Sequence, residues 1–329
     1  MVKYKDQKIH TGMCVAWISV ITVLLIVALS FLSLWAQRQS EFPSRQTNEI
    51  FEYEGEQYVL KKDIETFLVI GLDKFENTSP KDSYNNDQQA DFLMLFIIDN
   101  SEKTVSALHI DRDTMTGVNI LGLNGNRVDT VTMQIALSHT YGNGEEISCH
   151  NSMAAVSKLL KDVRIDHGMS VKMDAVALLN DLVGGVEVTL TEDFSEWDSS
   201  MVKGETVLLK GEQALYYVRN RSGLADSSNI ARMERQRQYM EAWYKRALTA
   251  MEADEAFMTS IFLKLADDVI SDCSGAQLQR LADKWFDYEF SGIRVLEGNS
   301  VKGEEYMEFY PSENSIMKNV IELFYVREN

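Results

Sequence analysis

The sequence predicts a mixed α/β (α+β) domain, with a central mixed β-sheet and helices on its faces, that follows one N-terminal transmembrane helix. Three features indicate this architecture. An uncharged apolar segment lies near the N-terminus, short apolar runs of strand length follow it, and segments with helical spacing come later in the chain. Strands mixed with helices in this order are typical of a sheet covered by helices.

The apolar segment from Cys14 to Trp35 contains no charged residue. As a helix with about 1.5 Å rise per residue, it is long enough to cross the ~30 Å hydrocarbon core. Lysines precede it at Lys3, Lys5 and Lys8, and this bias predicts a cytoplasmic N-terminus and an extracytoplasmic body. A cleaved signal peptide is the alternative, although the apolar run is long for one. We expect a single-pass cell-membrane protein with cytoplasmic residues 1–13, an anchor at 14–35 and a stalk at 36–60.

Three apolar runs after the stalk have the length of buried strands, and they occupy Thr66–Asp73, Asp91–Asp99 and Thr104–Asp111. Residues 75–90 are polar and predict a loop, whereas Asn100 and Ser101 suit a tight hairpin between the last two runs. A fourth strand is expected at Val186–Leu190.

Helices are predicted where apolar residues recur at spacings of three and four. A glycine pair ends one of them at Gly185, and the longest carries apolar residues such as Met240 and Trp243. Two or three further helices are expected after Met251. The predicted helical ranges before that point are Asn151–Val163, Met173–Gly185, Gly211–Val218 and Asn229–Met251.

The formal net charge of −18 argues against a nucleic-acid partner, which requires a basic face. No Walker or GxSxG motif occurs. No HExxH motif occurs either, so the motifs predict no zinc site. The three cysteines also lack ligand-like spacing. Cys14 lies at the edge of the predicted anchor, and the sequence leaves open whether Cys149 and Cys273 form a disulfide or remain free thiols.

Two aspartates lie at the ends of predicted strands. Asp73 closes the first strand and Asp91 opens the second, so their carboxylates can meet at one sheet edge if the strands are neighbours. Such a pair suits Mg²⁺, which binds through few protein oxygens plus phosphate. The alternative is that each aspartate caps a turn. Arg112 lies between Asp111 and Asp113. It either forms a structural ion pair or is held so that its cationic side chain points toward a ligand.

Arginines gather in one part of this acidic chain. Arg219 and Arg221 share a face in an extended segment, whereas Arg232 and Arg235 are three residues apart on a predicted helix. Arginine favours bidentate recognition of phosphate. For these four residues an anion site and a solvated basic face both remain open, and for Arg237 and Arg246 we expect the solvated face.

Several segments together resemble the LytR–CpsA–Psr family of bacterial envelope proteins over about residues 64 to 250. LKGEQALYYVRNR and RMERQRQ are the most specific of them. The other segments are FLVIGLD, ADFLMLFII, IDRDTM and LLNDLVGGVEVTL.

The resemblance implies a membrane-anchored extracytoplasmic phosphotransferase. Such enzymes move a glycopolymer, for example teichoic acid or capsule, from a polyprenyl-pyrophosphate carrier to peptidoglycan. The expected partners are therefore the lipid-linked glycopolymer, peptidoglycan and the membrane. The family fold also implies an apolar pocket for the polyprenyl chain. On this basis we expect a catalytic or lipid-binding domain at 61–250 and a helical C-terminal extension at 251–329.

The resemblance also assigns roles to residues. The two family aspartates that handle Mg²⁺ and pyrophosphate match Asp73 and Asp91. The arginine of the RDT motif matches Arg112, which would stabilise the transferred phosphoryl group, and Asp113 is the candidate general base. The residues that match the pyrophosphate-binding positions are Arg219, Arg221, Arg232, Arg235 and Gln236.

Four positions depart from the family pattern. Gln89 stands where an arginine is usual, and Asp111 stands where a proline is usual. Gln134 and Ala136 replace the lysine and asparagine of a Lys-x-Asn motif. Because cationic residues are lost and one acid is gained, a non-catalytic protein that binds polyprenyl phosphate or an anionic polymer is the alternative function.

Overall fold

The computed structural model describes residues 50–73, 86–122, 125–221, 224–225, 228–254 and 256–328. The predicted cytoplasmic segment, the predicted anchor and the first part of the predicted stalk lie outside these ranges. Within them, no helix combines the length and the apolar character that crossing a membrane requires.

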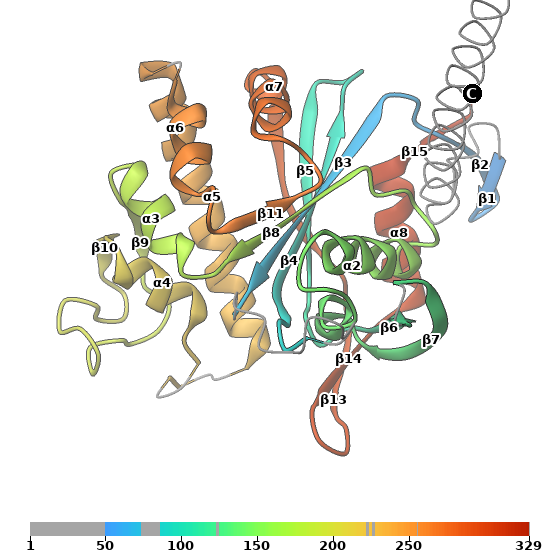
Figure 1. The fold of residues 1–329 in the computed structure, drawn as a ribbon, viewed down its shortest axis with the longest axis horizontal. Coiled ribbons are helices and arrows are strands. Elements are labelled where there is room, and N and C mark those ends of the chain that lie inside the picture. Colours follow the sequence, from blue (N-terminus) through green and yellow to red (C-terminus); the bar gives the residue numbers. More distant parts are fainter. Residues whose placement is uncertain are drawn as a thin grey trace, which may run out of the picture. The chain divides into compact units, whose positions relative to one another are not determined.

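A six-stranded mixed sheet forms the centre of the described part, with the order β11-β8-β3-β4-β5-β12 (Figure 1). β4 is antiparallel to β3 and β5, whereas β8 runs parallel to β3 and β12 runs parallel to β5. The predicted mixed sheet and the predicted hairpin are thus confirmed. The strands span Ile64–Leu72 (β3), Ala90–Asp99 (β4), Thr104–Ile110 (β5), His167–Lys172 (β8), Val269–Ser271 (β11) and Glu289–Val295 (β12).

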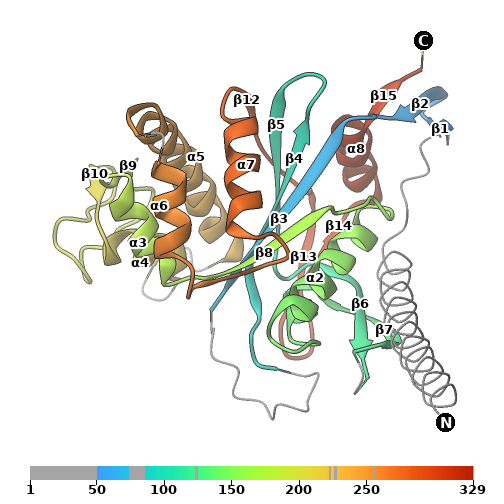
Figure 2. The same ribbon diagram turned by 45° about the horizontal axis from the view of Figure 1, so that its top comes forward.

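Both faces of the central strands are covered, which explains their nearly continuous apolar sequences. Leu68 and Leu95 have no exposed surface. On one face, Phe67 packs edge-on against Trp285 of α7 (Gly275–Trp285). On the other face lies α2 (Glu146–Leu159), which begins five residues before the predicted helix, and Figure 2 shows α2 and α7 on opposite sides of the strands.

A second group of elements builds its own apolar core beside the sheet. Val186, Leu209 and Tyr217 are fully buried in this core. The long helix α5 begins at a capped end, because the Ser228 hydroxyl accepts a hydrogen bond from the Ala231 amide. The predicted elements of this region are confirmed. They are α3 (Ala175–Leu182), β9 (Val186–Thr189), α4 (Glu212–Arg219) and α5 (Asn229–Ala253). β10 (Thr206–Leu209), which pairs with β9, was not predicted.

The predicted helical C-terminal extension and the predicted stalk differ from the structure. Among described residues after Met251 there are three helices, but also five strands, and β11 and β12 form the two edges of the central sheet. β15 pairs with β2, so residues 50–60 form strands rather than a stalk. The elements concerned are β1 (Ile50–Tyr53), β2 (Glu56–Leu60), α6 (Phe257–Lys264), β13 (Gly298–Lys302), β14 (Met307–Pro311), α8 (Glu313–Phe324) and β15 (Tyr325–Arg327).

A two-stranded sheet of β6 (Met115–Leu121) and β7 (Arg127–Gln134) continues from the central sheet, and a short 3₁₀ helix (Ile135–His139) follows it. The isolated bridge between Thr114 and Phe309 joins the start of this region to β14. The β13–β14 hairpin is therefore attached to the turn that carries Arg112.

Candidate functional site

Three neighbouring strands end at one edge of the central sheet. Leu72 pairs with Ala90 and Leu93 pairs with Ile110, so the residues that follow or flank these positions lie side by side. This places Asp73, Asp91 and Arg112 at the same edge. The predicted neighbouring strands are therefore confirmed.

Arg112 is held by three side chains. It forms a close ion pair with Asp91 and donates a hydrogen bond to the Gln89 side-chain oxygen at 2.6 Å. Its Nε also lies 3.6 Å from Asp113. Burial lowers the pKa of Arg112, while the Asp113 carboxylate opposes that shift and Arg221 adds to it. The predicted ion-pair network is thus present, and Gln89 supports Arg112 in place of a second cation.

Arg219 ends α4 and reaches back to the sheet edge. It forms a close ion pair with Asp73, and its other terminal nitrogen lies 3.6 Å from Asp174. Arg221 follows two residues later and is exposed. Within the described ranges, no side chain forms a hydrogen bond or an ion pair with Arg221.

Arg232 lies in the first turn of α5, and only 4% of it is exposed. It donates to Asn229 at 2.5 Å, and its Nε is buried without an acceptor among described residues. Burial and the nearby charges of Arg221 and Arg112 lower the pKa of Arg232 to about 10. Arg112, Arg221 and Arg232 therefore form a cluster of like charges, which we call the arginine cluster.

Asp111 links the Arg112 turn to α5. Its carboxylate accepts hydrogen bonds from the Asp113 amide at 2.8 Å and from the Asn229 side chain at 2.6 Å. Because Asn229 in turn accepts from Arg232, Asp111 links Arg232 to the turn that carries Arg112. Burial raises the pKa of Asp111. Its carboxylate favours the charged form of Arg232 and so partly offsets the repulsion within the arginine cluster.

Asp113 lies beside the β13–β14 hairpin. Gln134 donates one hydrogen bond to the Asp113 carboxylate at 3.0 Å and another to the Met307 carbonyl at 2.7 Å. The Asp113 carbonyl accepts from the Phe309 amide at 2.8 Å. Burial raises the pKa of Asp113, although Arg112 and Arg232 oppose this shift. A carboxylate within hydrogen-bond reach of a bound hydroxyl can act as a general base.

Two residues predicted to bind pyrophosphate instead form hydrogen bonds with other groups of the protein. Arg235 is 1% exposed, and its three donor nitrogens bind Glu192, the Tyr217 carbonyl and the Asn220 carbonyl. Gln236 donates to the Val218 carbonyl at 3.1 Å. These residues therefore support the segment between Tyr217 and Asn220 that presents Arg219 and Arg221. Sequence spacing alone put Arg235 with Arg232, but its partners lie elsewhere.

Two other arginines were expected on a solvated face, and this is confirmed for Arg246 but not for Arg237. Arg237 is partly buried, and burial lowers its pKa. Arg246 is exposed, and its Nε donates to the Gly185 carbonyl at 3.1 Å after α3. Arg246 thus has a structural contact although it faces solvent.

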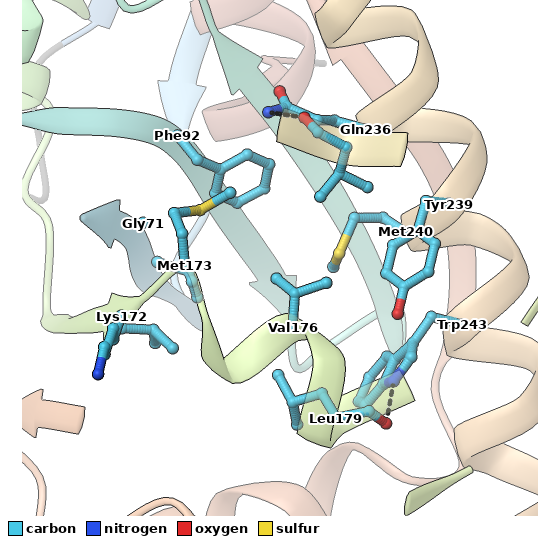
Figure 3. Close-up of a pocket in the computed structure, with 13 residues that line it drawn as sticks. Gly71, Phe92, Lys172, Met173, Val176, Leu179, Gln236, Tyr239, Met240 and Trp243 are labelled. Atoms are coloured by element: carbon cyan, nitrogen blue, oxygen red, sulfur yellow. Dashed lines mark hydrogen bonds between the residues drawn. The ribbon is translucent and has the colours of Figure 1, made fainter. Parts of the chain in front are cut away.

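An apolar cavity of about 140 Å³ lies between α5, α3 and the sheet (Figure 3). Gly71 makes room for it, because a Cβ at that position would lie 2.6 Å from the Met173 sulfur. The Gln236 side-chain oxygen is buried without a donor among described residues. The lining residues are Val69, Gly71, Phe92, Val171, Lys172, Met173, Val176, Leu179, Val218, Gln236, Tyr239, Met240 and Trp243.

A polar cavity of about 460 Å³ lies on the Asp113 side of the arginine cluster. It combines the Arg112 turn, the start of α5 and the β13–β14 hairpin. Sequence analysis missed the hairpin's part in this cavity, because an exposed strand pair carries little apolar signal. Its lining residues are Asp111, Asp113, Arg221, Ala225, Ser228, Asn229, Ile230, Ser300, Met307 and Glu308.

Comparison with known proteins agrees with this arrangement. The model of the LytR_cpsA_psr family matches residues 33–319, so the chain belongs to this family. TagU of Halalkalibacterium halodurans, named a polyisoprenyl-teichoic acid–peptidoglycan teichoic acid transferase, is 30% identical over 183 residues. That match covers 55% of this chain and 53% of the relative, so it spans about half of the relative's length.

Solved structures show that the fold is shared. TagV of B. subtilis matches with a TM-score of 0.59 at 21% identity, over 80% of this chain and 97% of that chain. The structure titled TagT bound to LIIa-WTA matches with a TM-score of 0.58 at 21% identity, over 84% and 93% of the two chains. The mixed sheet with covering helices is therefore the family fold.

Proposed function

We propose that the protein is a membrane-anchored, extracytoplasmic transferase that moves a glycopolymer of the teichoic acid class from a polyprenyl-pyrophosphate carrier to peptidoglycan. One observation carries the proposal: the apolar cavity is lined by Phe92 and Met173, which directly neighbour Asp91 and Asp174, the partners of Arg112 and Arg219. A ligand that satisfies both the cavity and the arginines has a phosphate group and a long apolar chain. The names of the TagU and TagT relatives supply the polymer class.

The arginine cluster favours a multiply charged anion. Arg221 disfavours the charged forms of Arg112 and Arg232, and Arg112 disfavours that of Arg232, so an anion between them removes this repulsion. Guanidinium groups bind phosphate oxygens in bidentate geometry. A pyrophosphate would therefore be held more tightly here than a single carboxylate.

The polyprenyl chain would enter the apolar cavity. Arg219 connects this cavity to the sheet edge, because its partner Asp174 directly follows the lining residue Met173. The cavity has room for only part of a polyprenyl chain as it stands. Rotation of Met173 and Met240 would enlarge it, since methionine side chains adapt readily.

The acceptor would approach through the polar cavity. A hydroxyl of the wall glycan attacks the phosphorus that bears the glycopolymer, and the bond from this phosphorus to the bridging oxygen breaks. Polyprenyl phosphate leaves with the electron pair, and Asp113 takes the hydroxyl proton. Arg112 stabilises the charge on the transferred phosphoryl group, which is the main demand of phosphoryl transfer.

The carboxylates of Asp73 and Asp91 are suited to Mg²⁺, since they offer hard oxygen ligands from paired strand ends. Each is engaged by an arginine, Arg219 and Arg112 respectively. Binding of the ion would exchange these ion pairs and free both guanidiniums for the pyrophosphate. When bound, Mg²⁺ would neutralise charge on the leaving phosphate.

A binding protein without transferase activity is the second candidate. It is favoured by Gln89, because this residue occupies a family arginine position and contributes no charge. The two candidates differ in one respect. A transferase releases polyprenyl phosphate, whereas a binding protein retains the intact donor.

The test uses the full chain in detergent with a synthetic polyprenyl-pyrophosphate donor, a glycan acceptor and Mg²⁺. We expect polyprenyl phosphate and a glycan product, both identified by mass. Arg221→Ala should weaken donor binding about tenfold, because an exposed cationic contact to phosphate is lost. Arg246→Ala is the matched control, since it removes the same charge from an exposed site outside the cluster. Donor binding without release would support the binding protein, and equal effects of both variants would refute the anion site.

A further inference from the structure

A histidine at the start of β8 lies close to an aspartate and a cysteine that follow β11. His167 Nδ1 lies 3.3 Å from Cys273 Sγ and 3.5 Å from an Asp272 carboxylate oxygen. One ligand atom from each of the three residues lies within 4.8 Å of the other two. The motifs gave no sign of this group, because β8 and β11 bring together residues more than 100 positions apart.

We propose that His167, Asp272 and Cys273 bind a divalent transition-metal ion of the zinc class. Tetrahedral zinc lies about 2.0–2.3 Å from nitrogen, oxygen and sulfur ligands, so its ligand atoms are separated by roughly 3.3–3.6 Å. The two distances from His167 Nδ1 match that range. Imidazole, thiolate and carboxylate together suit zinc, whereas Mg²⁺ and Ca²⁺ prefer oxygen ligands alone. Three protein ligands leave a fourth position for water or an added ligand.

Hydrogen bonds fix the ligands in place. One oxygen of Asp272 accepts from the Gly168 amide at 3.1 Å, which leaves the oxygen that faces His167 for the metal. The Cys273 amide donates to the Ser271 hydroxyl at 3.1 Å, and that hydroxyl donates to the Gly168 carbonyl at 2.9 Å. Supporting contacts of this kind orient metal ligands and raise affinity.

Burial and charge also favour a cation. Cys273 is 7% exposed, whereas 30% of the His167 side chain faces solvent and provides a path for entry. Asp272, Asp166 and Glu65 all place negative charge near His167. Lys284 and Arg164 pair with Glu65 and Asp166, so these two acids are partly neutralised and Asp272 remains for the metal.

This group is separate from the arginine cluster. His167 pairs with Phe67 of β3. Asp73 lies six residues further along the chain, directly after β3 ends. This separation corresponds to roughly 20 Å at about 3.3 Å per residue. β11 is a three-residue edge strand that leads into α7. A metal here would fix this edge strand and α7 to the start of β8, because its ligands come from β8 and from the segment between β11 and α7.

Cys149 provides a matched control. Its sulfur lies 2.8 Å from the position that a Cβ on Gly168 would occupy, whereas Cys273 contacts His167. Adjacent strand residues point to opposite faces, so the two thiols lie on opposite faces of the sheet. Both cysteines are free and buried.

The test is a titration of the full, untagged chain with Co²⁺, which reports thiolate ligation and tetrahedral geometry by its absorption. We expect one equivalent to give a thiolate charge-transfer band that Zn²⁺ abolishes by displacing Co²⁺. Cys273→Ser should remove the band, and Asp272→Asn and His167→Gln should weaken binding at least about tenfold. Cys149→Ser should leave the band and the affinity unchanged.

Four outcomes overturn the proposal. Three concern the band: its absence in the native chain, its survival in Cys273→Ser, and its loss in Cys149→Ser. The fourth is a disulfide between Cys149 and Cys273, detected by mass without reductant. Zn²⁺ should also raise the Tm of the native chain by several degrees and leave that of Cys273→Ser unchanged.

Discussion

Two buried arginines three residues apart on α5 differ in the partners that surround their guanidinium groups. Arg235 is 1% exposed and Arg232 is 4% exposed, so both are removed from solvent. Arg235 faces Glu192 at 2.5 Å and two backbone carbonyls. Arg232 has Asn229 as its hydrogen-bond partner, and two further arginines lower its pKa.

The difference separates a structural charge from a functional one. A guanidinium whose donors are all used by the protein has nothing left to offer a ligand. A guanidinium buried beside like charges makes the fold less stable, and that cost is relieved only when an anion binds. The comparison therefore assigns Arg235 to the fold, whereas Arg232 remains a residue of the anion site that we propose, although both occur in the same sequence motif.

The largest expected effect comes from Arg235→Met. This change leaves Glu192 buried without its ion pair, so we expect the free energy of unfolding to fall by about 3–5 kcal/mol. Urea denaturation at pH 7 measures it. Glu192→Leu combined with Arg235→Met should recover part of the loss, because no unpaired charge remains. A loss below about 1 kcal/mol in the single variant would contradict the structural role.

Arg232→Met should produce the opposite pattern. We expect donor affinity to fall about 100-fold, because a guanidinium that contacts the pyrophosphate is lost. The Tm should stay the same or rise, since the change also removes a repelling buried charge. Arg232→Lys should keep part of the affinity, because a positive charge remains without bidentate geometry. A Tm that drops as far as in Arg235→Met would show that the comparison fails.

His139 extends the comparison of buried cations to a side chain that can lose its charge. It is fully buried, with Nε2 3.1 Å from the Ser170 hydroxyl, and burial lowers its pKa to about 4. Because the folded state binds this proton less tightly than the unfolded chain, stability is complete above pH ~6.5 and is lost as pH falls toward 4. The slope contributed by this group reaches at most about 1.4 kcal/mol per pH unit.

Denaturation curves at several pH values between 7 and 4 measure this slope. His139→Gln should flatten it, whereas the contribution of buried His109, whose pKa is lowered to about 3, should remain. An unchanged slope in His139→Gln would show that the histidine is not the source. Arginine cannot lose its proton in this pH range, and that is why Arg232 keeps its charge when it is buried.

Much of the architecture could be predicted because its signals are local. The apolar runs that became β3, β4 and β5 are short and buried on both faces, and α5 has helical spacing over 25 residues. β11 and β12 escaped prediction because they are short or partly exposed edge strands, which lack a strong apolar pattern. Their place in the sheet depends on partners distant in the sequence.

The sequence by itself determined the family, the mixed sheet and the motif residues that meet at the sheet edge. Only the tertiary structure decided which motif residues belong to the arginine cluster, because burial beside Glu192 or beside Arg112 and Arg221 depends on contacts between distant segments. The same holds for Asp111, which acquired a partner in Asn229 of α5, and for the group formed by His167, Asp272 and Cys273. Charge and hydrogen bonding act over a few ångströms in space, and sequence spacing records that proximity only within one helix or strand.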